Sequence, residues 1–373
     1  MVNKSLLAML VRRFGAGNVE VYATRSTMNL YKSMPEASGI KRCHTLWVNS
    51  WPGHWAMLLR YISSALYNIL ILLFSRKGDV LFYNFDNVFA VRTLNWLNRF
   101  KHCTVITCCH AEMEYLSNAD RHTRLYKKLM TALTCGFFAN GKVKPSPGMH
   151  FIVLGDVILD NLRPLISDAM YARFASVDHP VEDTQSDNVN QQSESTGKKV
   201  HIGSVGIMNY YKGSDLLCRI LAENKFPRVE FSIVGQIQDH LDDFRNLGVT
   251  IPENPQEALN EEDFKRGVES LDFILLTYPT DNYRLIASGA FLDTLRYAKP
   301  LIALRTDYFE YMFRKYGAVG YLADDEQHLV ELLQKAPELN RQFPFAEIRR
   351  RLTAEALHPQ FDAAMDMFLS PQL

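Results

Sequence analysis

The stretch KVHIGSVGIMNYYKGSDLL, residues 199–217, carries the strongest structural signal in this sequence. Its first part, 199–206, is a β-rich apolar run that ends in glycine, and a loop closing with Lys212-Gly213 leads into a helical pattern. Ser214 or Asp215 could cap that helix, because short polar side chains accept hydrogen bonds from its first free backbone N–H groups. A strand, a glycine-containing loop and a helix in this order predict one unit of a parallel α/β sheet.

The same alternation of strand and helix patterns extends in both directions along the chain. Strands are predicted at 19–23, 79–84, 103–109, 136–140 and 150–154, and then at 199–206, 229–235, 273–278, 300–304 and 319–322. Helices are predicted at 5–14, 55–74, 88–100, 119–134, 214–223, 239–246, 261–269, 291–297 and 309–316. Apolar strands separated by helices are typical of parallel sheets covered on both faces. The predicted fold class is α/β, with two doubly wound parallel-sheet domains, although the chain opens with a helix where such a domain usually opens with a strand.

A polar segment divides the chain. Residues 176–198, SVDHPVEDTQSDNVNQQSESTGK, contain almost no large apolar side chains, and such a stretch cannot bury enough surface to offset its ordering entropy. We therefore expect an N-terminal domain over 1–175, a flexible linker over 176–198 and a C-terminal domain over 199–354. One or two amphipathic helices are predicted within 343–369, at the end of the chain.

Composition and charge fit a two-domain soluble protein. The chain has 373 residues, of which 47% are hydrophobic and 22% charged. Lysine plus arginine and aspartate plus glutamate both total 41, so no overall field favours nucleic acid as a partner. The six cysteines form no Cys-x-x-Cys pair, which favours free thiols in a reducing compartment over disulfides or a zinc site. The N-terminus lacks the charge and apolar order of a signal peptide, and we expect a cytoplasmic protein.

The region 51–76 is rich in tryptophan, tyrosine, leucine and isoleucine, with basic residues near its ends. Its most apolar part, 65–74, is about half the length of a membrane-spanning helix. Two interpretations fit: a helix packed against a sheet in the core, or a helix at a membrane interface that contacts the inner face of a membrane from one side. The core helix is favoured, since apolar helices are usually buried.

Two loops of the second half have the chemistry of an anion site. Gly203 and Gly206 let the backbone approach a ligand closely, and Lys212 beside Gly213 adds a compact positive charge before a helix. This pattern suits a diphosphate, although an exposed lysine in a turn fits it equally well.

The second loop follows the strand predicted at 273–278. Tyr283 and Arg284 precede Ser288-Gly289, which lies where a loop enters a helix and can present backbone amides to an anion. Arg284 could pair with phosphate and Asp293 with ribose hydroxyls. The alternatives are a plain helix cap at Ser288 and a solvated helix residue at Asp293.

At these residues the chain resembles retaining GT-B glycosyltransferases, close to glycosyltransferase family 4 (glycosyl transferases group 1). The resemblance lies in GIMNYYKGSDLL at 206–217, SIVGQI at 232–237 and SGAFLDTLRYAKPLIAL at 288–304. It implies two Rossmann-like domains facing a cleft, with the final helix, 355–373, packing back on the first domain. The family carries two glutamates eight positions apart; the second corresponds to Asp293, but Leu285 stands at the first.

The resemblance also implies roles for the site residues. Lys212 would neutralise the diphosphate of a nucleotide sugar, the Ser288-Gly289 amides would hold its distal phosphate, and Asp293 would hold the ribose. Val234-Gly235 would line the nucleotide pocket. No cofactor and no metal is needed for this arrangement, because the cation and the amides stabilise the charge that develops on the leaving diphosphate.

His110 follows the strand predicted at 103–109 and resembles the functional histidine that GT-B enzymes often carry at the end of an N-domain strand. It could act as a base or as a hydrogen-bond partner of the transferred sugar, or it could simply cap the helix that follows. Glu112 and Glu114 are possible alternates that fit solvated helix side chains better, and Asp86 is a weaker candidate.

The function indicated is transfer of a sugar, with retention, from a nucleotide-diphosphate sugar to a saccharide or lipid-linked acceptor in cell-surface polysaccharide or glycoconjugate synthesis. Two alternatives stay open. One is a nucleotide-sugar epimerase with a GT-B-like fold, and the other is a non-catalytic scaffold that binds a saccharide or a partner enzyme. Leu285 at the carboxylate position and the helix at the chain start favour the scaffold.

Overall fold

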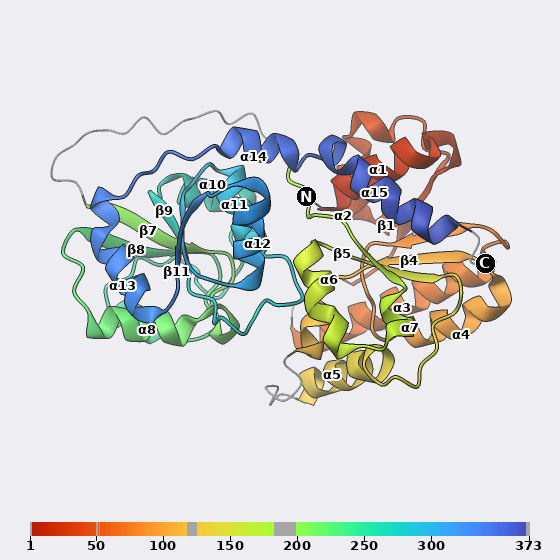
Figure 1. Ribbon diagram of the computed structural model, residues 1–373, viewed down its shortest axis with the longest axis horizontal. Coiled ribbons are helices and arrows are strands. Elements are labelled where there is room, and N and C mark those ends of the chain that lie inside the picture. Colours follow the sequence, from red (N-terminus) through yellow and green to blue (C-terminus); the bar gives the residue numbers. More distant parts are fainter. Residues whose placement is uncertain (1, 50, 52, 118–124, 183–198, 371–373) are drawn as a thin grey trace. The chain divides into compact units, whose positions relative to one another are not determined.

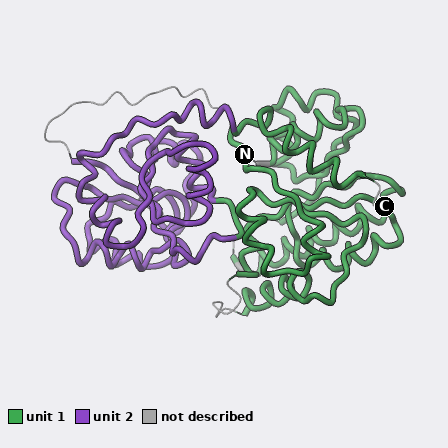
Figure 2. The backbone as a smooth tube through the Cα atoms, viewed as in Figure 1, with its two compact units in different colours: residues 1–182, 285–287, 352–373 green, residues 183–284, 288–351 purple. Residues whose placement is uncertain are grey.

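The computed structural model describes residues 2–49, 51, 53–117, 125–182 and 199–370, and it divides the chain into two compact units (Figure 2). Unit 1 comprises Met1–Glu182, Leu285–Ala287 and Leu352–Leu373, and unit 2 comprises Asp183–Arg284 and Ser288–Arg351. The chain therefore enters unit 1 from unit 2 for three residues, 285–287, and goes back to unit 2 at Ser288. It enters unit 1 again at Leu352.

The main sheet of unit 1 has four parallel strands in the order β3-β4-β5-β6 (Figure 1). They are β3 (Val80–Tyr83), β4 (Thr104–Cys108), β5 (Met149–Val153) and β6 (Phe174–Ser176). Between and around them lie α3 (His54–Phe74), α4 (Val91–Lys101), η3 (Ala111–Leu116), α5 (Leu125–Phe138), α6 (Asp156–Leu162), η5 (Arg163–Leu165) and α7 (Asp168–Tyr171). Sequential order of parallel strands places the connecting helices on one face, since such crossovers are right-handed.

The register of the strands shows which helices cover each face. Tyr83 and Phe151 are both in register with Thr107 of the strand between them, so their side chains lie on the same face of the sheet. The Tyr83 hydroxyl donates to a carbonyl of α3, 2.7 Å away. The Phe151 ring packs against two phenylalanines of α5. On the opposite face, Phe82 and His150 pack against α15 (Ala354–Leu369). The final helix thus covers the face of this sheet that α3 and α5 leave free.

The start of the chain forms a small layer of its own within unit 1. It contains α1 (Val2–Phe14), η1 (Ala16–Asn18), β1 (Glu20–Thr24), α2 (Arg25–Lys32), η2 (Pro35–Ala37) and β2 (Arg42–Leu46), and β1 pairs with β2 in parallel. Leu7, Val21 and Met28 belong to its core. α1 also packs against α15, where Arg13 lies 3.3 Å from Asp362. The prediction that the chain opens with a helix is confirmed.

Unit 2 has one parallel sheet of five strands in the order β11-β10-β9-β7-β8 (Figure 1). The strands are β7 (Val200–Val205), β8 (Val229–Val234), β9 (Phe273–Leu276), β10 (Leu301–Leu304) and β11 (Gly320–Ala323). The other elements are η6 (Tyr210–Lys212), α8 (Ser214–Glu223), α9 (Leu241–Asn246), α10 (Glu261–Glu269), α11 (Gly289–Arg296), α12 (Asp307–Tyr316), α13 (Glu326–Lys335), η7 (Ala336–Glu338) and α14 (Phe345–Arg351). The order reverses between β7 and β9, so the loops after these two strands flank the crevice where ligands of doubly wound sheets bind.

The strand predicted at 136–140 is wrong, because this segment completes helix α5. Phe137 and Phe138 are both buried, and they pack against each other and against Phe151 of the sheet. Adjacent buried aromatic residues mimic a strand in sequence, although here they end a helix that packs on the sheet. The strand β2 was not predicted because three of its five residues, Arg42, His44 and Thr45, are polar. The strand β6 was not predicted because it has only three residues.

The linker begins later than the sequence indicates. Ser176 ends β6, Val177 and Val181 are buried, and the backbone N–H of Asp178 donates to Gln360 of α15. These contacts place 176–182 in unit 1, and the rest of the expected linker, 183–198, lies outside the described residues. At the other boundary, unit 2 ends at Arg351, three residues before the expected end of the C-terminal domain.

The expectation that the helix at 55–74 is a core helix is also wrong. Over 55–74 only Ala56, Ala65 and Leu72 are buried, whereas Trp55 and Phe74 are 81% and 84% exposed. The helix is apolar around most of its circumference, but the sheet covers only one of its faces.

The close approach of two loops in unit 2 yields a stability prediction. A Cβ atom at Gly213 would overlap the carbonyl oxygen of Thr277, and the φ of +77° also disfavours any side chain. We expect Gly213→Ala to lower the free energy of unfolding by about 3 kcal/mol or more. Gly248→Ala is the matched control, because its φ is +73° but nothing lies within 4 Å. It should cost only about 1 kcal/mol. Equal losses in urea denaturation would contradict the proposed steric constraint.

Candidate functional site

Three glycines bring the loops after β7, β8 and β9 into backbone contact. A Cβ at Gly235 would overlap the Gly206 carbonyl, as one at Gly213 would overlap that of Thr277. The Thr277 hydroxyl lies 3.1 Å from the carbonyl oxygen of Lys212 and 3.2 Å from that of Gly213, and donates to them. Glycine is needed at these positions because only a residue without Cβ permits such contacts at positive φ. These contacts hold η6, which ends at Lys212, against the start of the loop after β9.

The ammonium group of Lys212 is positioned without a carboxylate partner. Its Nζ lies 5.7 Å from the centre of the Tyr278 ring, and it is 3.5 Å from where a Cβ at Gly206 would be. Within the part of the chain that the structure describes, Lys212 Nζ makes no ion pair. A cation–π contact offsets only part of the lost hydration of an ammonium group. The arrangement leaves Lys212 able to bind an anion.

The loop after β9 closes the other side of this cluster. The rings of Tyr278 and Tyr283 stack with centroids 4.2 Å apart, and the Ser288 hydroxyl donates to the Tyr278 hydroxyl at 3.3 Å. Ser288 Oγ also accepts from the N–H of Phe291 and so caps α11, as the alternative interpretation of this residue stated. A Cβ at Gly289 would meet nothing within 4 Å, so the space beside the start of α11 is open at this residue. The first backbone amides of a helix have no partner within the helix. Lys212 and Ser288 therefore contact the same tyrosine from two loops.

Asp293 lies one turn into α11 and is electrostatically linked to Lys212. Burial raises the pKa of Asp293 to about 6, and the positive charges of Arg296 and Lys212 act in the opposite direction. Asp293 is thus not the solvated helix residue of the alternative interpretation. A carboxylate that is ionised at neutral pH but poorly hydrated is a strong acceptor for ligand hydroxyl groups.

Two other predicted site residues are placed differently from Lys212. Arg284 Nε lies 3.5 Å from Asp307 Oδ2 at the first turn of α12, so a phosphate would compete with this carboxylate. The Val234 side chain is buried against Gly267 of α10, so Val234 contributes its backbone to the loop and not an exposed side chain.

In unit 1, His110 and Asp86 follow β4 and β3 at the carboxyl edge of the sheet. The His110 backbone N–H donates to Asp86 Oδ1 at 3.1 Å, and His110 Nε2 lies 3.1 Å from the carbonyl oxygen of Asn84. A carbonyl can only accept, so we assign the proton to Nε2, which leaves the lone pair on Nδ1. Burial lowers the pKa of His110, and the ring is neutral at pH 7. His110 thus offers an acceptor nitrogen.

Asp86 and Glu112 form a buried carboxyl pair beside His110. Burial raises the pKa of both groups, and the neighbouring Glu112 charge raises that of Asp86 further. The Tyr61 hydroxyl donates to Glu112 Oε1 at 2.7 Å. We infer that the pair retains one proton to higher pH than an exposed carboxyl group would, because ionising both of two neighbouring buried carboxyl groups is unfavourable. The prediction that Glu112 is a solvated helix side chain is wrong, since it is buried in the 3₁₀ helix η3.

Glu114 is held by the segment 285–287. Its Oε2 accepts from the backbone N–H of Leu285 at 2.9 Å, and its Oε1 accepts from the Ser117 hydroxyl at 2.9 Å. Glu114 is therefore not a freely solvated side chain, contrary to the prediction. Leu285, at the position of the missing carboxylate, is itself buried. The carboxylate of Glu114 thus contacts the backbone of Leu285, the position at which the resemblance implies a carboxylate side chain.

His179 is a site candidate that the sequence did not reveal. It lies just beyond β6, where burial lowers its pKa to about 4 and the charge of His110 acts in the same direction. Its Nδ1 lies 2.9 Å from the carbonyl oxygen of Pro180. The signal was present, because polar residues directly after a parallel strand lie at the ligand edge. The linker assignment of 176–198 obscured it.

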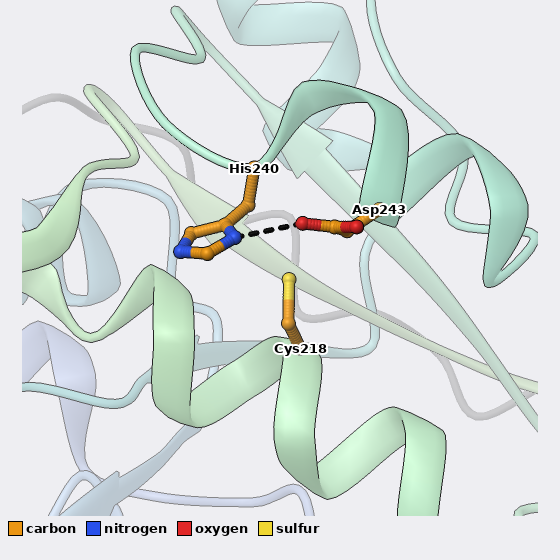
Figure 3. A group of neighbouring side chains, drawn as sticks. All are labelled: Cys218, His240 and Asp243. Carbon is orange, nitrogen blue, oxygen red and sulfur yellow. Dashed lines mark hydrogen bonds and ion pairs between the residues drawn. The ribbon is translucent and has the colours of Figure 1, made fainter.

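One group among the described residues has the spacing of metal ligands (Figure 3). Ligand atoms of Cys218, His240 and Asp243 all lie within 4.8 Å of one another, on α8 and at the start of α9. His240 Nδ1 lies 2.8 Å from Asp243 Oδ2, and burial raises the pKa of Cys218 to about 12, which disfavours the thiolate that metals bind. The His240–Asp243 pair accounts for the arrangement, and none of the three residues belongs to the Lys212 or His110 clusters.

The raised pKa of Asp293 predicts a pH-dependent effect of Asp293→Asn. The folded unit retains a proton that the unfolded chain releases near pH 3.8, so the contribution of Asp293 to stability falls as pH rises from about 4 to about 6. Relative to the parent, Asp293→Asn should gain about 1–3 kcal/mol of unfolding free energy between pH 4 and pH 7.5. Asp324→Asn is the control, because Arg305 lowers the pKa of Asp324 and no such gain is expected. An Asp293→Asn effect that does not change with pH would contradict the burial of this carboxyl.

Comparison with known proteins supports the architecture. No protein-family model and no curated protein sequence matches this chain. Among solved structures, the apo form of the lipopolysaccharide outer core galactosyltransferase WaaB is 13% identical over 93% of this chain and 99% of that one, with a TM-score of 0.59. Anabaena HepE in complex with UDP-glucose is 12% identical, covering 98% and 95%, with a TM-score of 0.60.

The N-terminal domain of trehalose-6-phosphate phosphatase from Candida albicans is similar as well. It is 10% identical over 98% of this chain and 93% of that one, with a TM-score of 0.56. At this level of identity the likeness concerns the fold. Two α/β units with parallel sheets, matched over nearly the whole chain to such glycosyltransferase structures, show that the chain has the GT-B fold.

Proposed function

We propose that this protein is a glycosyltransferase that moves a sugar from a nucleotide-diphosphate sugar to a saccharide or lipid-linked acceptor. The single observation that carries this proposal is the ammonium of Lys212. It makes no ion pair with any described carboxylate, and it is held at the place where the strand order of unit 2 reverses, near the start of α11. The structures of HepE with UDP and with UDP-glucose support a nucleotide-sugar ligand.

In this proposal unit 2 binds the donor. Lys212 and the amides of Gly289 and Ala290 hold the diphosphate, with Gly206, Gly213 and Gly235 keeping the loops close enough for it. Asp293 accepts from the ribose hydroxyls. Tyr283 and the backbone of Val234 border the nucleotide, and Arg284 reaches the phosphates only by leaving Asp307.

The chemistry follows from this placement. Breaking the bond between the sugar and the diphosphate leaves negative charge on the diphosphate oxygen. A fixed ammonium and aimed backbone amides stabilise that charge without reorganisation, which is the largest single contribution in many transferases. We propose that these groups act without a metal ion or another cofactor, and that the sugar is transferred with retention.

His110 is the residue of unit 1 that we propose to contact the transferred sugar. Its neutral ring offers the Nδ1 lone pair to a sugar hydroxyl, and Asp86 fixes its backbone. Asp86 is therefore a positioning residue. We further propose a cytoplasmic location at the inner face of a membrane and a role in cell-surface polysaccharide or glycoconjugate synthesis.

A second function is supported by the cluster in unit 1. Nucleotide-sugar epimerases with this type of fold gather acidic and histidine side chains, and Asp86, Glu112, His110 and His179 lie at one edge of one sheet. Incubation with a UDP-sugar alone separates the two functions, because only the epimerase would yield an isomer without an acceptor.

A non-catalytic scaffold is the third candidate. Leu285 replaces the carboxylate that the resemblance implies, and the same fold occurs in the N-terminal domain of a phosphatase. Calorimetry with UDP and GDP distinguishes this candidate, since a scaffold of this kind would bind neither nucleotide while remaining folded.

Lys212→Ala tests the donor site. Removing the ammonium should weaken binding of UDP or GDP about 10- to 100-fold, because one charge-assisted contact to phosphate is lost. Isothermal titration calorimetry measures the effect. Lys225→Ala, which removes an exposed lysine of the same unit, is the matched control and should leave the affinity unchanged. Unchanged affinity in Lys212→Ala would remove the assignment.

His110→Ala tests the contribution of unit 1. Loss of the acceptor nitrogen should lower kcat about 100-fold and leave KM for the donor within a factor of about three. Release of nucleoside diphosphate from the best donor in a panel of nucleotide sugars is the readout. His201→Ala, at a partly exposed histidine of unit 2, serves as the control. Full turnover in His110→Ala would show that this histidine is only structural.

A further inference from the structure

The outward side of α3 is an apolar stripe. Leu59, Ile62, Leu66 and Leu70 recur at steps of three or four residues, so they lie on one side of the helix, and all four are exposed. Leu66 is the most exposed of the four, at 57%. An exposed apolar stripe of this length is unusual in a soluble unit and marks an interaction surface.

Helix α4 lies beside α3 and extends this surface (Figure 1). Trp96 and Phe100 of α4 are 56% and 68% exposed, with ring centroids 5.5 Å apart. Lys101 at the end of α4 donates to the Leu73 carbonyl of α3 at 2.8 Å, which joins the two helix ends. We define the α3–α4 face by Leu59, Ile62, Leu66, Leu70, Trp96 and Phe100.

Aromatic side chains gather at the start of α3. Trp47, Trp51 and Trp55 are exposed. Arg60 Nη1 lies 2.8 Å from the Trp51 carbonyl oxygen, and the Tyr67 hydroxyl donates to the Trp47 carbonyl at 3.1 Å. These two hydrogen bonds tie Trp47 and Trp51 to helix α3. Tryptophan prefers the headgroup region of a bilayer, where its ring is apolar and its N–H can still donate.

Most of the charged residues on the segments that form the α3–α4 face are basic. Residues 37–78 and 87–111 contain no aspartate or glutamate. Arg76 and Lys77 follow α3, and Arg92 and Arg99 flank Trp96 on α4; all four are exposed. Asp79 is the nearest carboxylate along the chain, and it accepts from the backbone N–H of Arg76. An apolar surface whose exposed charges are mostly basic is complementary to anionic lipid headgroups.

The hydrogen bonds on the inner side of α3 argue against a helix that crosses a membrane. Of the helices described, α3 is the one long and apolar enough to span a bilayer, over Trp55–Phe74. However, its Tyr61 hydroxyl donates to Glu112, and its Asn68 carbonyl accepts from Tyr83. The Tyr61 carbonyl accepts from Asn87 at 2.8 Å. Inserting α3 across a bilayer would break these hydrogen bonds and uncover the sheet.

We propose that the α3–α4 face docks unit 1 on an anionic lipid bilayer, with α3 in the plane of the interface. A second copy of the chain is a poorer occupant, because a two-fold contact would bring the basic rims together. This inference specifies the surface and lipid charge behind the membrane contact of the proposed function, and its test needs no donor or acceptor.

Vesicle co-sedimentation tests the proposal with the full chain. We expect binding to vesicles of phosphatidylcholine with 30% phosphatidylglycerol, and at least tenfold weaker binding to phosphatidylcholine alone. Leu66→Glu should reduce binding to the anionic vesicles at least tenfold. Arg76→Gln and Lys77→Gln should each reduce it about fivefold, with a weaker salt dependence.

Met367→Glu is the matched control, because Met367 is 47% exposed on α15, which covers the other face of the sheet. It should bind vesicles like the parent. Far-ultraviolet circular dichroism checks the fold of each variant, and UDP affinity checks its donor site. A folded protein that binds vesicles but does not bind UDP would contradict the proposed function and leave the membrane-docking inference standing. Absence of vesicle binding in the folded parent would overturn the inference. So would a dimer in light scattering that Leu66→Glu dissociates.

Discussion

The structure of unit 2 depends on backbone contacts that only glycine permits. Gly206 and Gly235 meet after β7 and β8, and Gly213 meets Thr277 after β9. These contacts draw the loops on both sides of the strand-order reversal together. The consequence is electrostatic, because the ammonium of Lys212 is held over the Tyr278 ring and forms no ion pair with a described carboxylate. A charge held in this way binds an anion without first breaking an ion pair, and the amides at the start of α11 add to the same positive potential.

In unit 1, in contrast to the charged Lys212 of unit 2, burial favours the uncharged forms of the ionisable groups. It keeps His110 and His179 neutral and keeps a proton on the Asp86–Glu112 pair. The carboxyl edge of this sheet therefore presents hydrogen-bonding groups with little net charge. Such an edge suits a sugar, whose hydroxyl groups both donate and accept, whereas the edge of the unit 2 sheet suits a diphosphate. The α3–α4 face adds a third surface, apolar and basic, with the properties of a lipid-binding surface.

The sequence predicted the elements whose signals are local. The stretch 199–217 folds as the predicted strand, loop and helix, and the ten predicted strands fail only at 136–140. Phe137 and Phe138 were misassigned because two adjacent buried residues can arise either in a strand or at the end of a helix facing a sheet. The strand β6 was missed since only three residues form it and polar residues follow.

The failures in the site have a different cause, which is burial set by distant parts of the chain. Glu112 becomes buried through Tyr61 and Asp86, both far away in sequence, and Glu114 meets a backbone N–H 171 residues later. No local pattern reports such contacts. The exposure of α3 was missed for the same reason, because an apolar helix has the same sequence whether one or both of its sides are covered. The sequence could indicate that Lys212 and Ser288 lie close together, because each lies in a loop that follows a parallel strand, and the structure places both against Tyr278. Their role in ligand binding, and that of Asp293, stays a prediction.

A crystal structure with UDP would show whether unit 2 binds the donor through Lys212. We expect the diphosphate within hydrogen-bonding distance of Lys212 Nζ and of the amides of Gly289 and Ala290, with the ribose against Asp293. An ordered nucleotide bound elsewhere on the chain, with Lys212 free of phosphate, would contradict it.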